Sequence, residues 1–120
     1  MNEKSLYGFR KIEKIYSKKK ILKEIDITLN ESKCLLLSGK NGSGKSTLLK
    51  ILAGLEKPDE AIIDYEGEFY RWGNICHSLR KNIIYLHQQP FMFSGSVESN
   101  IAYGLRFKSL SRIERAKALC

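Results

Sequence analysis

The segment from Gly39 to Thr47 combines glycines, a lysine and small hydroxyl residues at a spacing that could bind a polyphosphate. Residues 39–46, GKNGSGKS, fit the pattern G-x-x-x-x-G-K-[ST]. Glycines allow positive φ and bring the backbone close to an anion without a Cβ in the way. The N–H groups from about Asn41 to Thr47 can then point inward at a helix N-terminus, where the helix dipole also favours negative charge.

This loop predicts binding of Mg-ATP, with ATP and Mg²⁺ as the cofactors. Lys45 is expected to reach the β- and γ-phosphates as a point charge, and the Ser46 hydroxyl is expected to bind Mg²⁺, which prefers hard oxygen ligands. The expected nucleotide-binding residues of the loop are Gly39, Lys40, Asn41, Gly42, Ser43, Gly44, Lys45, Ser46 and Thr47. A plain glycine-rich turn is the disfavoured alternative, because the pattern would occur by chance in roughly one of several hundred chains of this length.

A phosphate loop of this kind needs a strand before it and a helix after it, and apolar patterns predict both. The unbroken apolar run Cys34 to Leu37 is typical of a parallel strand that is covered on both faces. Lys45 to Ala53 carries apolar residues at helical spacing, with Gly54 as the expected C-terminal cap and Pro58 beyond it. The sequence therefore predicts a strand, the loop and a helix in this order.

Other elements are predicted on both sides of this unit. Phe9 to Tyr16 and Ile21 to Leu29 are expected to form a hairpin through a lysine-rich turn. Further short strands are expected at Ala61 to Ile63, which ends at a turn around Glu66-Gly67, and at Ile83 to Leu86. Helices are expected near Val97 to Tyr103 and from Ser111, where a capping box begins and no cap follows before Cys120. The chain is therefore expected to stop within an element.

Composition limits the classes of protein that remain. The 120 residues, 42% of them apolar, suffice for one compact core at most. No apolar stretch approaches the ~18 residues of a membrane span, and a cytoplasmic location is expected. The three cysteines lack metal-ligand spacing and are interpreted as reduced thiols. The net charge of +8 includes the run Lys18 to Lys20, which lacks interleaved aromatics and favours a solvated turn, so no nucleic-acid partner is expected.

The run Gly39 to Leu49, GKNGSGKSTLL, resembles the Walker A loop of ABC-type ATPases. The resemblance implies an α/β P-loop NTPase core with an N-terminal antiparallel β layer. It also implies that Tyr16, at the end of the first strand, stacks on adenine. An ordinary strand tyrosine is the alternative, because aromatics are common in strands.

A second resemblance lies downstream, where Ile84 to Phe93 is similar to the strand and Q-loop of transporter ATPases, and Val97 to Ile101 is similar to their "TVxENI" segment. This resemblance implies that Gln88 is the Q-loop glutamine, a catalytic residue together with Lys45. Its amide oxygen would reach Mg²⁺ or a water on it, and could withdraw without the desolvation that a carboxylate demands. Gln89 takes this role if the alignment shifts by one residue, and a plain polar loop residue is the third interpretation.

The resemblance extends over essentially all 120 residues but over only the first half of such a domain, truncated before the signature motif. Residues 1–120 are therefore expected to form a partial ABC-type ATP-binding domain, from the Walker A loop to the Q-loop and the start of the helical subdomain. The chain contains no LSGGQ-like signature, Walker B strand or switch histidine, and His77 and His87 are interpreted as ordinary side chains. Asp64 follows a Walker B-like run but leads into a turn, so an exposed hairpin is favoured over a metal-associated acid. The segment Pro58 to Ala61 departs from the Ser-Gly usual in the family.

The expected function is that of the ATP-binding subunit of an ABC importer, peripheral on the inner face of the membrane. Its expected partners are a membrane permease and a second ATP-binding subunit, and this chain alone is expected to bind ATP without turnover. Gln88 to Leu105, with the basic residues after it, most resembles importers of oxyanions such as tungstate or molybdate. Two alternatives stay open, namely a non-catalytic nucleotide-binding remnant and a soluble ABC-type ATPase acting on ribosomes or DNA.

Overall fold

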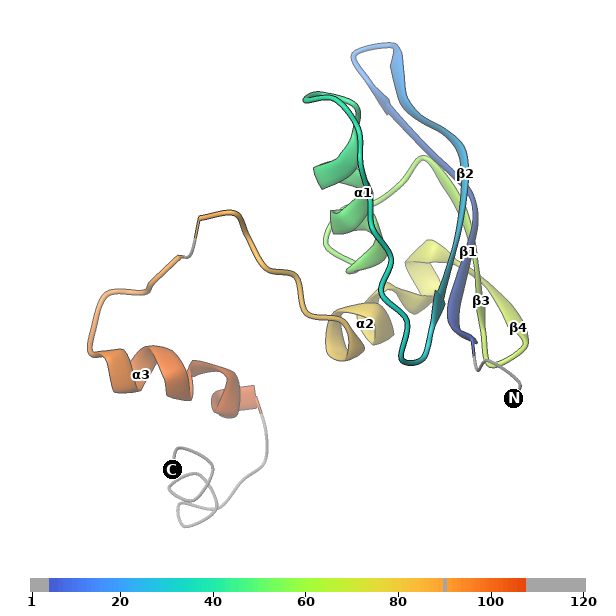
Figure 1. Ribbon diagram of the computed structural model, residues 1–120. Coiled ribbons are helices and arrows are strands. Elements are labelled where there is room, and N and C mark those ends of the chain that lie inside the picture. Colours follow the sequence, from blue (N-terminus) through green and yellow to red (C-terminus); the bar gives the residue numbers. More distant parts are fainter. Residues whose placement is uncertain (1–4, 90, 108–120) are drawn as a thin grey trace. The chain divides into compact units, whose positions relative to one another are not determined.

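The computed structural model describes residues 5–89 and 91–107 of the 120-residue chain. It divides into two compact units, the first ending at Tyr85 and the second beginning at Leu86. The first unit contains a four-stranded antiparallel sheet, two helices and the phosphate loop (Figure 1). The described part of the second contains helix α3 (Val97–Ala102) and the 3-10 helix η1 (Tyr103–Phe107).

Strands β1 (Ser5–Tyr16) and β2 (Lys19–Asn30) form the predicted hairpin and extend beyond the predicted bounds. The two residues between them, Ser17 and Lys18, have φ of 46° and 65°. Positive φ at both central residues is the geometry of a two-residue hairpin turn whose twist matches that of the strands. The lysine-rich turn is thus confirmed, and Tyr16 pairs with Lys19 at its base.

Strands β3 (Glu60–Tyr65) and β4 (Glu68–Arg71) complete the sheet in the order β2-β1-β3-β4, with every neighbouring pair antiparallel. The predicted turn at Glu66-Gly67 is confirmed, with φ of 55° and 82°. Sequence reasoning did not find β4, because four residues are too few to show a clear alternation.

Helices α1 (Lys45–Leu52) and α2 (Trp72–Asn82) lie on one side of the sheet in Figure 1. The Trp72 indole N–H donates to the carbonyl oxygen of Ile51 at 3.1 Å and so fastens α2 to the end of α1. Gly54 follows α1 with φ of 76°, and a Cβ there would lie 2.6 Å from the Cys76 carbonyl oxygen. The predicted helix and its glycine cap are confirmed, whereas α2 was missed because only Ile75 and Leu79 are buried on it.

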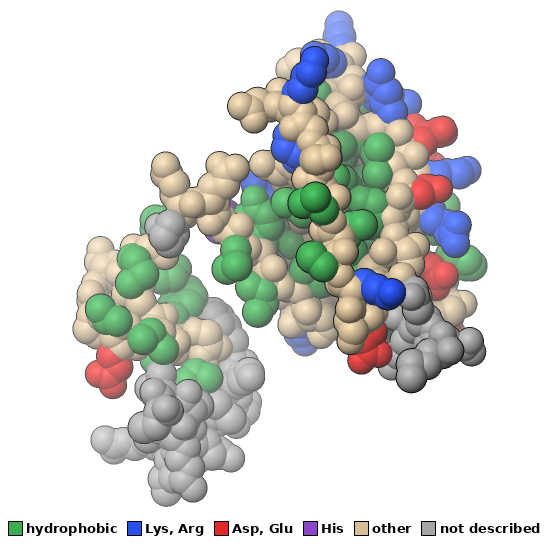
Figure 2. All heavy atoms as spheres, viewed as in Figure 1, with side chains coloured by type: hydrophobic (Ala, Val, Ile, Leu, Met, Phe, Trp, Pro, Cys, Tyr) green, Lys and Arg blue, Asp and Glu red, His purple; other side chains and the backbone are tan. Residues whose placement is uncertain are grey.

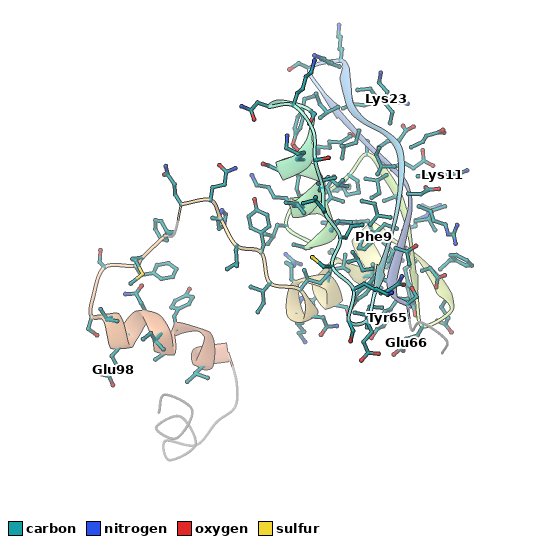
Figure 3. The ribbon with its side chains drawn as sticks, in the orientation of Figure 1. Phe9, Lys11, Lys23, Tyr65, Glu66 and Glu98 are labelled. Carbon is teal, nitrogen blue, oxygen red and sulfur yellow. The ribbon has the colours of Figure 1, made fainter. Side chains whose placement is uncertain are left out.

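Sheet and helices enclose one hydrophobic core, and Figure 3 shows Phe9 between them. Its buried members come from β1, β2, α1, β3 and α2 and are Tyr7, Phe9, Ile12, Leu22, Leu48, Ile51, Leu52, Ala61, Ile63, Ile75 and Leu79. The core therefore fixes the start of α1, where the phosphate loop ends, against the β1–β2 hairpin.

Two strand predictions are wrong for this structure, namely the parallel strand at Cys34 to Leu37 and the short apolar strand at Ile83 to Leu86. Cys34 to Leu37 and Ile83 to Leu86 have no strand partner within residues 5–89 and 91–107. Leu36 and Ile84 are 89% and 88% exposed. A parallel strand forms only with hydrogen-bonded neighbours and cover on both faces. The described residues supply no hydrogen-bonded neighbour, and their cover is partial, since Leu37 and Ile83 pack against the core while Leu36 and Ile84 do not.

The helix predicted near Val97 to Tyr103 is confirmed as α3 followed by η1. The Ser96 hydroxyl caps it by accepting from the Ser99 N–H at 3.1 Å. The helix predicted from Ser111 lies outside the described residues. Within the described ranges no helix is both long enough and apolar enough to cross a membrane.

Candidate phosphate-binding site

The phosphate loop ends in the left-handed residue Gly44, which is the N-cap of α1 with φ of 97°. No side chain caps this helix by a hydrogen bond. The first backbone N–H groups of a helix have no intrahelical acceptor, so those of α1 are available to an anion. This agrees with the phosphate-binding geometry that the glycine pattern predicts.

Two glycines of the loop are required by close approaches as well as by backbone angles. A Cβ on Gly39 would lie 2.8 Å from the Ser43 hydroxyl oxygen, and a Cβ on Gly44 would lie 2.8 Å from Cγ2 of Ile21. Both distances are shorter than carbon contacts allow. The second also means that the start of α1 lies directly against the β1–β2 hairpin (Figure 1).

The Lys45 ammonium lies inside the curve of the loop. Its Nζ donates to the carbonyl oxygens of Gly39 and Lys40, each at 2.7 Å, and more weakly to the Ser43 hydroxyl at 3.4 Å. The Ser43 N–H closes the loop by donating to the Lys40 carbonyl at 3.2 Å. The lysine thus fixes the shape of the loop and concentrates positive charge where the helix N–H groups begin.

Ser46 and Thr47 belong to the first turn of α1, with Ser46 exposed and Thr47 half-buried. Leu48, the next residue, is buried in the core and anchors this turn. In the described ranges no group of three or more His, Cys, Asp or Glu side chains could hold a metal ion. A single hydroxyl fits Mg²⁺, because this ion usually keeps several waters and binds through few protein ligands plus substrate phosphates.

Tyr16 ends β1 beside the hairpin turn, with 42% of its surface exposed. The Lys14 ammonium lies 5.0 Å from the centroid of its ring. The hairpin that carries Tyr16 also carries Ile21, whose Cγ2 would lie 2.8 Å from a Cβ on Gly44, so the phosphate loop ends against the same hairpin.

Sequence reasoning missed an apolar pocket of about 300 Å³ that adjoins the loop. It lies between β2 and the extended segment 35–37, and its lining residues are Leu22, Ile25, Ile27, Leu35, Leu36, Leu37, Ser43, Gly44, Lys45 and Leu48. Figure 2 shows apolar side chains at the surface of the first unit. The apolar run Cys34 to Leu37 could have indicated this pocket, because part of the run is exposed and lines it.

In the second unit Gln88 and Gln89 form an exposed bend. The Asn100 side chain holds the following segment, accepting from the Phe93 N–H at 2.7 Å and donating to the Phe93 carbonyl at 3.0 Å. Because Gln88 and Ser46 belong to different units, the shared magnesium site predicted for them stays a prediction.

The remaining sequence candidates have ordinary surroundings. Asp64 lies within β3, opposite Gly8 on one side and Phe69 on the other, so its predicted place in a hairpin is confirmed, but it is half-buried and not exposed as predicted. Cys34 and Cys76 are free thiols, as expected.

The chain matches the ABC transporter family over residues 22–119. It belongs to this family, as the Walker A-like loop implied. Among solved structures, cbiO1 of Clostridium perfringens, part of the ABC transporter complex cbiONQ, is similar with a TM-score of 0.75 and 26% identity. That similarity covers 94% of this chain and 47% of the other. The fold class of a P-loop ABC ATPase is therefore confirmed.

Curated relatives include both transporters and import proteins. A probable ABC transporter ATP-binding/permease protein of Haemophilus influenzae is 36% identical over 84% of this chain and 18% of its own length. Antigen peptide transporter 2 of Rattus norvegicus is 39% identical over 73% of this chain and 12% of its own length. A sulfate/thiosulfate import ATP-binding protein of Pectobacterium atrosepticum is 36% identical over 82% of this chain and 29% of its own length. The chain thus spans less than a third of each of these relatives.

Proposed function

We propose that this chain binds Mg-ATP through the loop Gly39 to Thr47 and forms part of the ATP-binding component of an ABC transporter. The observation that carries the proposal is the Lys45 ammonium held by two loop carbonyls at 2.7 Å, beside a helix N-terminus without a side-chain cap. Backbone donors and a fixed cation together form a binding site for a polyphosphate.

Each group then has a defined role. The N–H groups from Asn41 to Thr47, apart from that of Ser43, which donates to the Lys40 carbonyl, would donate to the phosphate oxygens, and Lys45 would add its charge to the β- and γ-phosphates. An ammonium has three donors, so Lys45 can exchange its weak Ser43 contact for a phosphate oxygen and keep both carbonyls. When bound, Mg²⁺ neutralises part of the phosphate charge, and the Ser46 hydroxyl would be its protein ligand. Tyr16 would stack on the base, and Gln88 would act as the Q-loop residue.

The relatives support a transport role over an action on ribosomes or DNA, because their names describe transporters and import proteins. Their diversity does not support the narrower oxyanion-importer class that residues 88–105 suggested. We therefore propose transport as the function and leave the solute unassigned.

In the whole protein, a membrane permease and a second ATP-binding subunit are the proposed partners, with the complex peripheral on the inner face of the membrane. Phe91, Met92 and Phe93 are suitable anchors for an apolar helix of the permease. Phe91 is 76% and Met92 59% exposed, and Phe93 stacks on Tyr103 at 4.4 Å. The exposure of Phe91 and Met92 supports docking over the alternative that Phe91 and Phe93 fold into the domain's own core.

Calorimetric titration with Mg-ATP tests the proposal. Lys45→Ala should weaken binding by about 10- to 100-fold, since one charge-assisted hydrogen bond contributes about 1.5–3 kcal/mol. Lys50→Ala, at the other end of α1, is the matched control and should bind as the parent chain does. Chelation of Mg²⁺ should also lower the affinity. Equal ATP affinity in the parent and Lys45→Ala chains would exclude this loop as the site.

A further inference from the structure

The end of β1 is fastened to the segment that follows α1. The Ile15 N–H donates to Oδ2 of Asp59 at 2.7 Å, and the Asp59 N–H donates to the Glu13 carbonyl at 2.9 Å. Asp59 lies in the segment where the sequence departs from the family pattern. Its carboxylate satisfies a strand N–H one residue before Tyr16, so this departure has a structural consequence at the expected base-stacking residue.

Lys14 joins the same segment to the Tyr16 ring. Its Nζ donates to the Lys57 carbonyl at 2.7 Å, lies 3.6 Å from Oε1 of Glu56, and stands 5.0 Å from the centroid of the Tyr16 ring. The side chains of Lys14 and Glu56 are only 15% and 22% exposed, so they are held more firmly than a solvated surface pair. One ammonium therefore links the Glu56–Lys57 segment to one face of the tyrosine.

The segment is in turn tied to α1. The N–H groups of Leu55 and Glu56 both donate to the Lys50 carbonyl, at 2.8 and 3.3 Å, after the tight turn at Gly54. A continuous set of contacts thus runs from the phosphate loop through α1 to Glu56, from Glu56 to Lys14, and from Lys14 to Tyr16. An α-helix is a rigid spacer of about 1.5 Å per residue, so this path can fix the separation between Tyr16 and the phosphate loop.

We propose that Lys14 is a positioning residue for the nucleobase. It orients the Tyr16 ring through a cation–π contact on one face, and leaves the opposite face for the adenine of ATP. The inference rests on the proposed function, because it requires Tyr16 to be the base platform. Lys20 does not share this role: it donates to Oε1 of Glu13 at 2.9 Å, and this hydrogen bond raises the pKa of its ammonium.

The test compares two ligands that share phosphates and differ in the base. Mg-ATP and Mg-tripolyphosphate are titrated calorimetrically into the parent chain and Lys14→Met. We expect a loss of about 3- to 10-fold in ATP affinity, in keeping with the modest strength of a cation–π contact plus the ordering it provides. Tripolyphosphate affinity should stay within about twofold, because the phosphate loop is unchanged.

Further variants separate positioning of the Tyr16 ring from general stability of the fold. Lys14→Arg keeps the cation and should retain ATP affinity, and Lys23→Met is the matched control on the outer side of the hairpin (Figure 3). In a Tyr16→Ala background, Lys14→Met should cause no further loss, because coupled residues give non-additive effects. If Lys14→Met does not fold, Glu56→Gln is titrated with both ligands instead, because it removes the carboxylate that holds the Lys14 ammonium. This variant should bind ATP more weakly than the parent chain and tripolyphosphate equally well.

The outcomes are distinct. Equal losses for ATP and tripolyphosphate, or a full additional loss in the Tyr16→Ala background, would assign Lys14 a purely structural role and overturn the inference. Unchanged ATP affinity in Lys14→Met would overturn it as well. A parent chain that binds neither ligand would instead overturn the proposed function itself.

Discussion

The apolar residues of the first unit fall into two groups that differ in what covers them. Phe9 and Ile63, on antiparallel strands, are 1% and 0% exposed beneath α1 and α2. Leu35 and Leu36, just before the phosphate loop, are 60% and 89% exposed. Antiparallel strands joined by tight turns find their partners nearby in the chain, whereas parallel strands need partners that come from distant segments. The antiparallel layer is therefore complete in itself, and the segment before the loop is not.

The largest effect that we expect from an incomplete domain concerns the rate of ATP hydrolysis. The 120 residues contain a phosphate loop but no signature loop and no Walker B acid. General-base catalysis commonly contributes about 10²- to 10⁴-fold and electrostatic stabilisation about 10²- to 10³-fold. We expect a polypeptide of these residues to bind ATP with turnover about 10⁴-fold or more below that of a complete ATPase. Steady multiple turnover that Lys45→Ala abolishes would contradict this prediction.

A smaller effect concerns stability. Phe9→Ala should lower the free energy of unfolding by about 3–5 kcal/mol, because it leaves a cavity in the core. Leu36→Ala should change it by less than about 0.5 kcal/mol, because that side chain is already in water. Denaturant unfolding followed by far-UV circular dichroism measures both. If Leu36→Ala is as destabilising as Phe9→Ala, the segment before the loop is part of the core and the contrast between the two groups is lost.

The correct and the wrong sequence predictions separate in the same way, into the antiparallel layer and the exposed apolar segments. The β1–β2 hairpin, the Glu66-Gly67 turn, α1 and its Gly54 cap all depend on local signals, and each was predicted. The strands at Cys34 to Leu37 and Ile83 to Leu86 were predicted wrongly, since an apolar run shows the need for cover and not whether cover is present.

At the candidate site, too, features that depend on neighbouring residues were predicted, and contacts between distant residues were not. The glycine and lysine spacing of the phosphate loop is a local signal and was sufficient to find it. The contacts of Lys14 with Lys57 and of Ile15 with Asp59 were missed, because the partners are 43 and 44 residues apart in the chain. The pairing of β1 with β3 ends at Glu13 and Glu60, and so brings the adjacent residues close together.

The smallest expected effect on nucleotide binding concerns the second unit. In a full-length protein assembled with the proposed permease, Met92→Asp should disrupt assembly, because it places a charge among the exposed apolar side chains of Phe91, Met92 and Phe93, the proposed docking segment. ATP affinity should change less than about twofold, since Met92 lies in a different unit from the phosphate loop. Co-purification with the permease and ATP titration are the two measurements. Normal assembly and transport by the variant would exclude docking at this segment.

Amide hydrogen exchange of this chain with and without Mg-ATP tests directly whether the loop from Gly39 to Thr47 binds the phosphates. We expect slower exchange for the backbone N–H groups between Asn41 and Thr47, because these donors would bind the phosphates. The same protection should be absent in Lys45→Ala at equal nucleotide concentration, whereas Lys50→Ala should retain it. Protection by Mg-ATP that appears elsewhere in the chain and leaves residues 41–47 unchanged would contradict the assignment of the phosphate loop.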